Sequence, residues 1–206
     1  MLFINYYKRK ISEKFFMLGE NTMGNTFPET YYKKVINLLL SQSSNLDELN
    51  DPESVLNGTL ELLSHFLNLR NGRVFLWDTQ SSKLVIRYSY GLTRQQISVG
   101  KYEISEGVTG EAFGAGRAVL VKNVDKAPHF KRKVSSVSSS GSRSSSYIAV
   151  PITADGCDFG ILAVDCNNTH DGDLEAYALV LSLVAKMFGE IVHKYELDDF
   201  SLYNAA

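Results

Sequence analysis

The fold is decided by Glu106-Gly107-Val108-Thr109-Gly110-Glu111-Ala112-Phe113, which is followed by Gly116-Arg117-Ala118-Val119 and then by Asn123-Val124. Glycines, a threonine suited to cap a helix and a short apolar run predict a tight loop, one short helix, a second loop and a strand. A loop–helix–loop of this kind, which we call the lid (106–116), typically covers a small-molecule pocket. We expect Thr109 to act as the cap and the glycines to act as hinges.

Apolar spacing predicts the elements that precede the lid. Helices are expected over 31–41 and 52–68, and the second begins at Asp51-Pro52-Glu53, where a cap residue, a proline and an acid follow each other. Gly72 is expected to end the turn after this helix. Strands over 73–78 and 83–90 are joined by a hairpin loop, and a short helical pattern over 91–100 follows them.

The elements after the lid complete an α+β pattern. Strands are predicted over 118–121, 147–153 and 157–165, with a hairpin at Asp155-Gly156, and a helix is predicted over 171–197. The serine-rich stretch 135–146 between them is expected to be a mobile loop, either a flexible insert or a carrier of phosphorylation sites. The order predicts an antiparallel sheet of about five to six strands, with the N- and C-terminal helices on one face and lid loops and short helices on the other.

The length of 206 residues favours one domain with extensions. We divide the chain into an N-terminal amphipathic segment and linker (1–28), the domain itself (29–197) and a C-terminal tail (198–206). In the first of these, cations alternate with apolar residues at helical spacing over 1–18. That pattern fits a partner-facing or dimer-facing helix or a mobile segment, and it also fits an interfacial membrane helix or a targeting segment.

Composition excludes several classes of protein. Apolar residues make up 44% of the chain, charged residues make up 21%, and the net charge is -2, so we expect a soluble cytoplasmic domain without direct nucleic-acid contact. Cys157 and Cys166 are expected to lie too far apart along one strand to form a disulfide, which fits a reducing compartment. We expect no apolar run long enough to span a membrane.

The last predicted helix carries two apolar stripes at heptad spacing. One stripe suffices to pack a helix on a sheet, so the second indicates a partner helix and a homodimer formed through 174–195. The alternative is a thick core helix that is buried on most of its surface. The two stripes consist of Leu174, Ala178, Leu181, Ala185, Phe188, Val192 and Tyr195, and of Tyr177, Val180, Val184, Met187 and Ile191.

Catalytic signatures are missing from the sequence. It contains no Gly-x-Ser-x-Gly, His-Glu-x-x-His, phosphate-binding loop or Cys-x-x-Cys, and its four histidines are scattered, so we predict no catalysis, no metal and no cofactor. His129, within Pro128-His129-Phe130, fits either a donor to a ligand or loop packing. Asp165 ends an apolar strand, where it either caps the following turn or faces the pocket.

The motifs together resemble the GAF domain family. They comprise Tyr90-Gly91-Leu92, the lid entry, Gly116–Val119 with Asn123-Val124, Ala149-Val150-Pro151-Ile152 and Phe159–Asp165 before a final helix. The Asn123-Val124 and Pro128-x-Phe130 pairs make the chain most similar to the N-terminal GAF domains of NifA-like sigma-54-dependent regulators, over about 31–195. The signature of cyclic-nucleotide-binding GAF domains is missing from this sequence.

The resemblance implies a regulatory module that binds a small effector or a partner protein and controls an ATPase output outside these 206 residues. An anionic effector is expected between sheet and lid, near the polar candidates Arg87, Asn123, His129 and Arg132. A ligand-free interaction scaffold is the alternative, and a GAF-fold methionine sulfoxide reductase using the two cysteines is a weaker one. The apolar wall is expected to consist of Phe75, Trp77, Tyr88, Phe113, Val121, Phe130 and Tyr147.

Overall fold

The computed structural model describes residues 52–67, 69–131, 133–134, 145–167 and 171–195. All of them belong to one compact unit, Glu48–Ala206. Several predictions lie outside the described residues: the helix over 31–41, the amphipathic segment 1–18, most of the serine-rich loop and the C-terminal tail.

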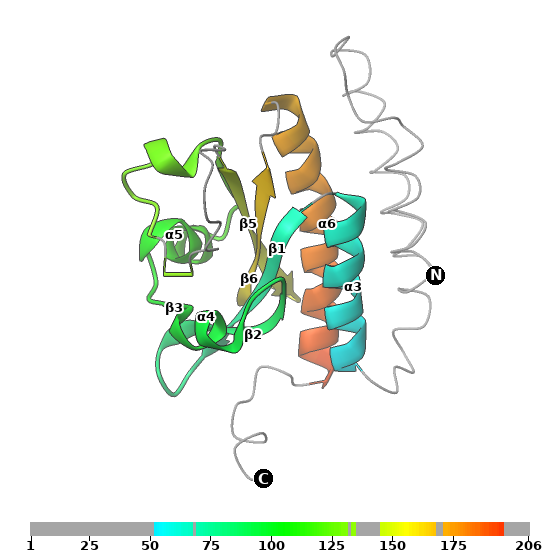
Figure 1. The fold of residues 1–206 in the computed structure, drawn as a ribbon. Helices are drawn as coiled ribbons and strands as arrows, with labels where there is room; N and C mark the ends of the chain where they lie inside the picture. Colours follow the sequence, from blue (N-terminus) through cyan, green and yellow to red (C-terminus); the bar gives the residue numbers. More distant parts are fainter. Residues whose placement is uncertain (1–51, 68, 132, 135–144, 168–170, 196–206) are drawn as a thin grey trace. The chain divides into compact units, whose positions relative to one another are not determined.

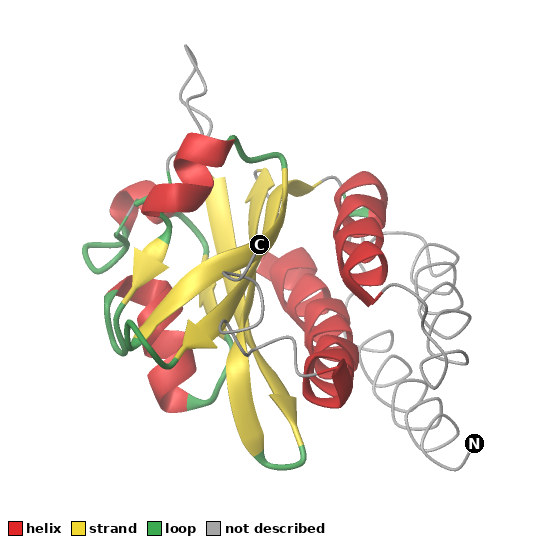
Figure 2. Ribbon diagram, turned by 90° about the horizontal axis from the view of Figure 1, so that it is seen from below, coloured by secondary structure: helices red, strands yellow, loops and turns green. Residues whose placement is uncertain are grey.

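A six-stranded antiparallel sheet forms the centre of this unit, in the order β3-β2-β1-β6-β5-β4. Its strands are β1 (Leu69–Asp78), β2 (Lys83–Tyr90), β3 (Lys101–Tyr102), β4 (Val119–Val121), β5 (Ser145–Ala154) and β6 (Cys157–Asn167). Helices α3 (Pro52–Phe66) and α6 (Asp171–Tyr195) cover one face, and α4 (Arg94–Val99) and α5 (Gly107–Ala115) lie over the other, together with the short 3-10 helix η2 (Val124–Lys126) (Figures 1 and 2). The predicted α+β class and layering are confirmed.

Most elements lie where their chemistry predicts them. Asp155 and Gly156 turn between β5 and β6 with φ values of 48° and 79°, which matches the positive φ at both central positions of a tight hairpin. Thr93 is the N-cap of α4 and forms a capping box. Its hydroxyl accepts from the backbone amide of Gln96, and the Gln96 side chain accepts from the backbone amide of Thr93.

Two local predictions are wrong, and one strand was not predicted. Gly72 lies within β1, paired with both Tyr90 and Val164, because pairing on two sides holds the chain extended four residues earlier than expected. Ser145 and Ser146 belong to β5, where the buried Ser146 hydroxyl donates to the Lys122 carbonyl over 2.8 Å. The two-residue strand β3 was not predicted, since two residues carry no readable alternation.

Helix α6 is buried along both of its heptad stripes. Every stripe residue from Leu174 to Val192 is at most 8% exposed, and the helix packs on β5 and β6. The structure therefore corresponds to the core-helix alternative for these stripes. Among the described residues α6 is long and apolar enough to cross a membrane by length and composition alone, a test that a buried core helix also meets, and 61% of that window is buried inside the domain.

Candidate functional site

The lid closes over the sheet through a buried apolar core on its inner side. We call this the lid-side cluster. Sheet and lid both contribute to it. Its buried members are Phe75, Leu84, Ile86, Tyr102, Val108, Ala112, Val124, Val134, Tyr147, Ala149, Ile161 and Ala163, and Trp77, Phe113, Val121 and Phe130 are among those packed against it half-buried.

Ring contacts join the sheet to the lid at one place and to the segment after η2 at another. Trp77, at the end of β1, stacks on Phe113 of α5 with 5.3 Å between ring centroids and 19° between planes. Phe130, which follows η2, meets Tyr147 of β5 edge-on at 5.0 Å. Trp77, the single tryptophan of the chain, lies at one of these contacts.

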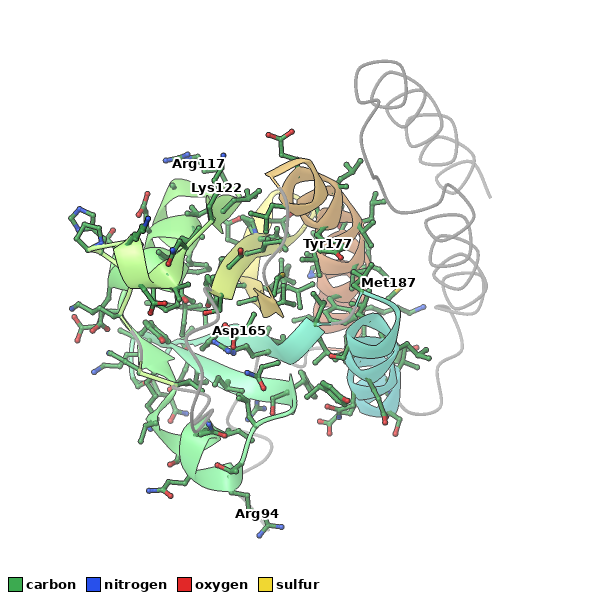
Figure 3. The ribbon with its side chains drawn as sticks, turned by 45° about the horizontal axis from the view of Figure 1, so that its top comes forward. Arg94, Arg117, Lys122, Asp165, Tyr177 and Met187 are labelled. Carbon is green, nitrogen blue, oxygen red and sulfur yellow. The ribbon has the colours of Figure 1, made fainter. Side chains whose placement is uncertain are left out.

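A polar group is embedded in the same region. Arg73 of β1 forms an ion pair with Asp165 of β6, and the Asn71 amide donates to the same carboxylate oxygen over 2.9 Å. The Arg73 side chain is 3% exposed and that of Asp165 is 15% exposed. Figure 3 shows Asp165 in the interior of the domain, whereas Arg94, Arg117 and Lys122 lie at its surface.

Sheet register explains why an arginine fits into this apolar region. Arg73 lies opposite Ala163 on β6, and Ala163 lies opposite Ala149 on β5. These two alanines carry only methyl groups on the lid side, so the long Arg73 side chain can lie across them. Its guanidinium carbon reaches 5.5 Å from the Tyr147 ring centroid.

The polar group is linked to the lid by one hydrogen bond. Thr109 of α5 is 3% exposed, and its hydroxyl lies 2.7 Å from the hydroxyl of Tyr147. The prediction that Thr109 caps the lid helix is therefore wrong, because Glu106 occupies the N-cap position and Thr109 faces inward. Its hydroxyl instead connects the lid to the tyrosine that touches Arg73.

The charges in this region are fixed by burial and pairing. Burial disfavours the charged guanidinium, but Asp165 together with Tyr147 and Tyr102 outweighs this effect, so the pKa of Arg73 is raised and Arg73 stays protonated. Burial raises the pKa of both Tyr102 and Tyr147, so the two phenols stay neutral. The Arg73–Asp165 pair thus carries one positive and one negative charge among neutral neighbours.

Six of the predicted apolar wall residues meet in the lid-side cluster: Phe75, Trp77, Phe113, Val121, Phe130 and Tyr147. Tyr88 does not join them. A bulge in β2 places Tyr88 opposite Val74 while Ile86 lies opposite Phe75, so Tyr88 shares the sheet face of Val74. One extra residue, Arg87, reverses the alternation, and the sequence gives no signal for it.

The predicted polar candidates lie elsewhere. His129 is exposed, Arg87 is half-buried on β2, and Asn123 caps η2 by accepting from the Asp125 amide over 2.9 Å. Arg132 lies outside the described residues. The Asp165 side chain pairs with Arg73 on the lid side of the sheet. Of its two predicted roles, this position fits the one that faces the space under the lid and not the turn cap. Arg73 was missed because a cation inside an apolar strand reads as a solvent-facing residue.

A second polar contact holds the start of the lid from outside. The Glu106 carboxylate accepts from Lys133 over 2.5 Å, from Lys131 over 3.3 Å and from the Glu103 amide over 3.0 Å. Lys133 also donates to the Lys101 carbonyl over 2.8 Å. Lys131 and Lys133 are thereby tied to the N-terminus of α5, and Lys133 is tied to β3 as well.

These contacts make lid stability depend on acid pH. The Lys133 hydrogen bond, the Glu103 amide and Lys131 lower the pKa of Glu106 from 4.5 to about 2. A lowered pKa stabilises the folded state above pH 4.5, and this contribution disappears as the pH falls toward 2. We expect Glu106→Gln to cost about 1 kcal/mol or less at neutral pH, because both lysines are largely exposed.

Urea denaturation at neutral pH and near the lower end of the pH range from 4.5 to about 2 checks this prediction. The difference between wild type and Glu106→Gln should shrink as the pH falls. Glu111→Gln, on the outer face of α5, is the matched control and should show little difference at either pH. A difference that grows in acid would contradict the assignment.

The lid helix also depends on a close backbone approach at Gly110. A Cβ at this position would lie 2.2 Å from the Glu103 carbonyl oxygen. We expect Gly110→Ala to lower the free energy of unfolding by about 1–3 kcal/mol and to displace α5. Trp77 fluorescence reports the displacement, since its stacking partner Phe113 lies on the same helix.

Gly58→Ala provides the control for this substitution. Gly58 lies within helix α3, and a Cβ there meets nothing within 4 Å. We therefore expect a gain of about 0.5–1 kcal/mol and unchanged Trp77 fluorescence. An equal gain from Gly110→Ala would show that the lid does not rest on the Glu103 carbonyl.

The two cysteines lie at opposite ends of β6 and are both free. Cys157 is exposed beside the hairpin turn, whereas Cys166 is buried. Burial and the adjacent Asp165 raise the pKa of the Cys166 thiol to about 12, which leaves it protonated and a poor nucleophile. Among the described residues, no group of three or more histidine, cysteine or acidic side chains is placed to hold a metal ion.

The antiparallel sheet with a lid on one face and two helices on the other defines a small sensory-type α+β domain, and the GAF domain family model matches residues 51–188. The chain belongs to the GAF domain family. It is 24% identical over 166 residues to the nitrogen fixation protein AnfA of Azotobacter vinelandii, covering 81% of this chain and 31% of AnfA. The chain thus spans about a third of the length of the curated relatives that it matches.

Solved structures share the fold. The A. aeolicus nlh2 GAF domain in an inactive state superposes with a TM-score of 0.68 at 20% identity, covering 82% of this chain and 99% of that domain. The free methionine-R-sulfoxide reductase of Neisseria meningitidis, in complex with its substrate, superposes with a TM-score of 0.65 at 24% identity, covering 85% and 98%. At these identities the likeness concerns the fold alone.

Proposed function

We propose that this domain is a regulatory sensor that binds a small effector between lid and sheet and thereby controls an output domain. The observation that carries the proposal is the Arg73–Asp165 ion pair. It lies in the interior of the domain and is linked to the lid by Tyr147 and Thr109. Binding at the pair would change the contacts that hold the lid closed.

Similarity to the Nif-specific regulatory proteins of Herbaspirillum seropedicae and Azospirillum lipoferum supports the regulatory part of the proposal. From the resemblance of the sequence to NifA-like regulators, we propose that the output is a sigma-54-dependent transcriptional activator, which a lid movement would restrain or release. An effector shifts such an equilibrium only by the difference between its affinities for the open and closed lid. An effector between lid and sheet would oppose two ring contacts, Trp77–Phe113 from the lid and Phe130–Tyr147 from the segment after η2.

The test combines thermal stability with Trp77 fluorescence against a panel of organic acids, amino acids and nucleotides. A ligand that binds the folded state raises the unfolding midpoint by mass action. If it also moves the lid, Trp77 fluorescence changes in the same concentration range. A protein that shows neither response to any compound would contradict effector binding.

A ligand-free scaffold is the second candidate, because aromatic rings from both layers already fill the contact between lid and sheet. In that case no compound shifts the midpoint, and partner proteins bind through the helices. We also propose that the domain does not catalyse sulfoxide reduction, since the Cys166 thiol is buried and protonated. Thiol-dependent reduction of methionine sulfoxide that is lost in Cys166→Ser would contradict this.

Homodimerisation through 174–195 stays a proposal. Both heptad stripes are buried within the chain, so a partner would meet the half-buried side of α6 that carries Leu179 and Leu183. Light scattering across a range of protein concentrations tests it, and a monomer at the highest concentration would contradict it.

A further inference from the structure

Arg73 has a donor that the protein does not use. Its Nε atom is buried and has no hydrogen-bond partner, although the guanidinium is paired with Asp165 at Nη2. An unsatisfied buried donor costs about 1–3 kcal/mol, and more when the group is charged. Among the described residues only one other buried side-chain atom, the Ser64 hydroxyl oxygen, is in this condition, and Ser64 belongs to helix α3.

The surroundings of this donor suit recognition of a small molecule. The neighbouring side chains on the sheet are small, since Ala163 lies opposite Arg73 and Ala149 lies opposite Ala163. Asp165 is the more accessible end of the pair, at 15% exposure against 3% for Arg73. A ligand therefore reaches the pair from the Asp165 side, and an oxygen acceptor on it can satisfy Nε.

Charge determines which ligands are favoured. The pair is neutral as a unit, and the phenols of Tyr102 and Tyr147 that accompany it are uncharged. A dicarboxylate brought next to the pair would place two further negative charges in a poorly solvated region that already holds Asp165. An uncharged or zwitterionic molecule presents an oxygen to Nε and leaves the region neutral.

We infer that the Arg73–Asp165 pair is the recognition point of the effector and that it selects small molecules without net charge that offer an oxygen acceptor to Arg73 Nε. This inference rests on the proposed effector-binding function and narrows it. It differs from the anionic effector expected from sequence, because that expectation counted Arg87, His129 and Arg132 and not the Asp165 carboxylate that is paired with Arg73.

The first experiment uses probes of matched skeleton and different charge. Succinamide is compared with succinamate and succinate, and asparagine with aspartate, by thermal shift and by titration calorimetry on the whole chain. The uncharged or zwitterionic member of at least one series should bind, with its charged counterpart about tenfold weaker or worse, a difference of about 1.4 kcal/mol.

The second experiment changes the charge of the site. Asp165→Asn keeps the shape and leaves Arg73 unpaired, so the preference should move from the uncharged probe to the monocarboxylate. The double substitution Arg73→Met with Asp165→Leu removes both charges together and should abolish binding of every wild-type ligand. Arg94→Met, on the exposed surface of α4, is the control and should leave the affinities unchanged.

The outcomes separate the two claims. Binding of succinate or aspartate in preference to the neutral probes would overturn the charge selectivity and leave effector binding intact. Unchanged affinities in a folded double variant would overturn the location at the pair. No binding of any probe, with Nε bonded only to a water molecule in a crystal structure, would overturn both. If Asp165→Asn does not fold, the double variant decides the location and the wild-type probe series decides the selectivity.

Discussion

Asp165→Ala is expected to lower the free energy of unfolding by about 3–5 kcal/mol, because it leaves the Arg73 guanidinium charged, buried and without its counter-ion. It also removes the acceptor of the Asn71 amide, which is buried beside it. The loss of stability thus arises mainly from two buried polar groups without partners, the Arg73 guanidinium and the Asn71 amide, and little of it arises from lost packing. Urea denaturation, with a check that the slope is unchanged, measures it.

Removing both partners together distinguishes this cause from a packing defect. Arg73→Met combined with Asp165→Leu should be far less destabilising than Asp165→Ala alone, since replacing a buried ion pair by apolar groups is often neutral or stabilising. Asp158→Ala, at an exposed position of the same strand, should cost little. A double variant as unstable as the single one would show that the pair is not the source of the effect.

Phe188→Ala is expected to cost about 3–5 kcal/mol, independent of protein concentration. Phe188 is fully buried on α6, within a chain that contains both heptad stripes of this helix in its interior. Truncation of its ring leaves a cavity between α6 and the sheet, because the backbone there is held close: a Cβ at Gly189 would lie 2.3 Å from the Thr153 carbonyl oxygen.

The concentration dependence is the discriminating measurement. If α6 met a second subunit through these stripes, Phe188→Ala would weaken association, and the unfolding midpoint would vary with protein concentration. Val99→Ala is the control, since Val99 is 51% exposed on α4, away from α6, and should cost little at any protein concentration. A small loss of stability in Phe188→Ala, together with a lower mass in light scattering, would favour packing of α6 against a second subunit.

Sequence reasoning reached the architecture because local chemistry and global fold agree there. Asp155-Gly156 selects a tight hairpin, and Pro52 with its flanking acid begins α3. Each of these signals consists of residues that are adjacent in the sequence, so it can be recognised without knowledge of the fold. Strand alternation likewise places Phe75 and Trp77 of β1 on the lid side of the sheet, whereas their role in ligand binding stays a prediction.

The polar half of the site could not be read in this way. Arg73 and Asp165 are 92 residues apart, and each alone fits a bland interpretation, a solvent-facing cation and a turn cap. Only the pairing of β1 with β6 makes them partners. Tyr88 was placed on the wrong face because a single bulge shifted the register, and Thr109 was read as a cap because a threonine near a helix start usually is one.

The sheet order has a consequence for how the chain is made. Strand β1 lies between β2 and β6, and Asn71 and Asp165, which hydrogen-bond across that junction, are 94 residues apart. While the ribosome is still producing the lid, the β1–β2 hairpin is complete but one long edge of β1 has no neighbour. Such an open edge invites pairing with other nascent chains. Synthesis that stalls before β6 should therefore yield aggregates and not a smaller folded sensor.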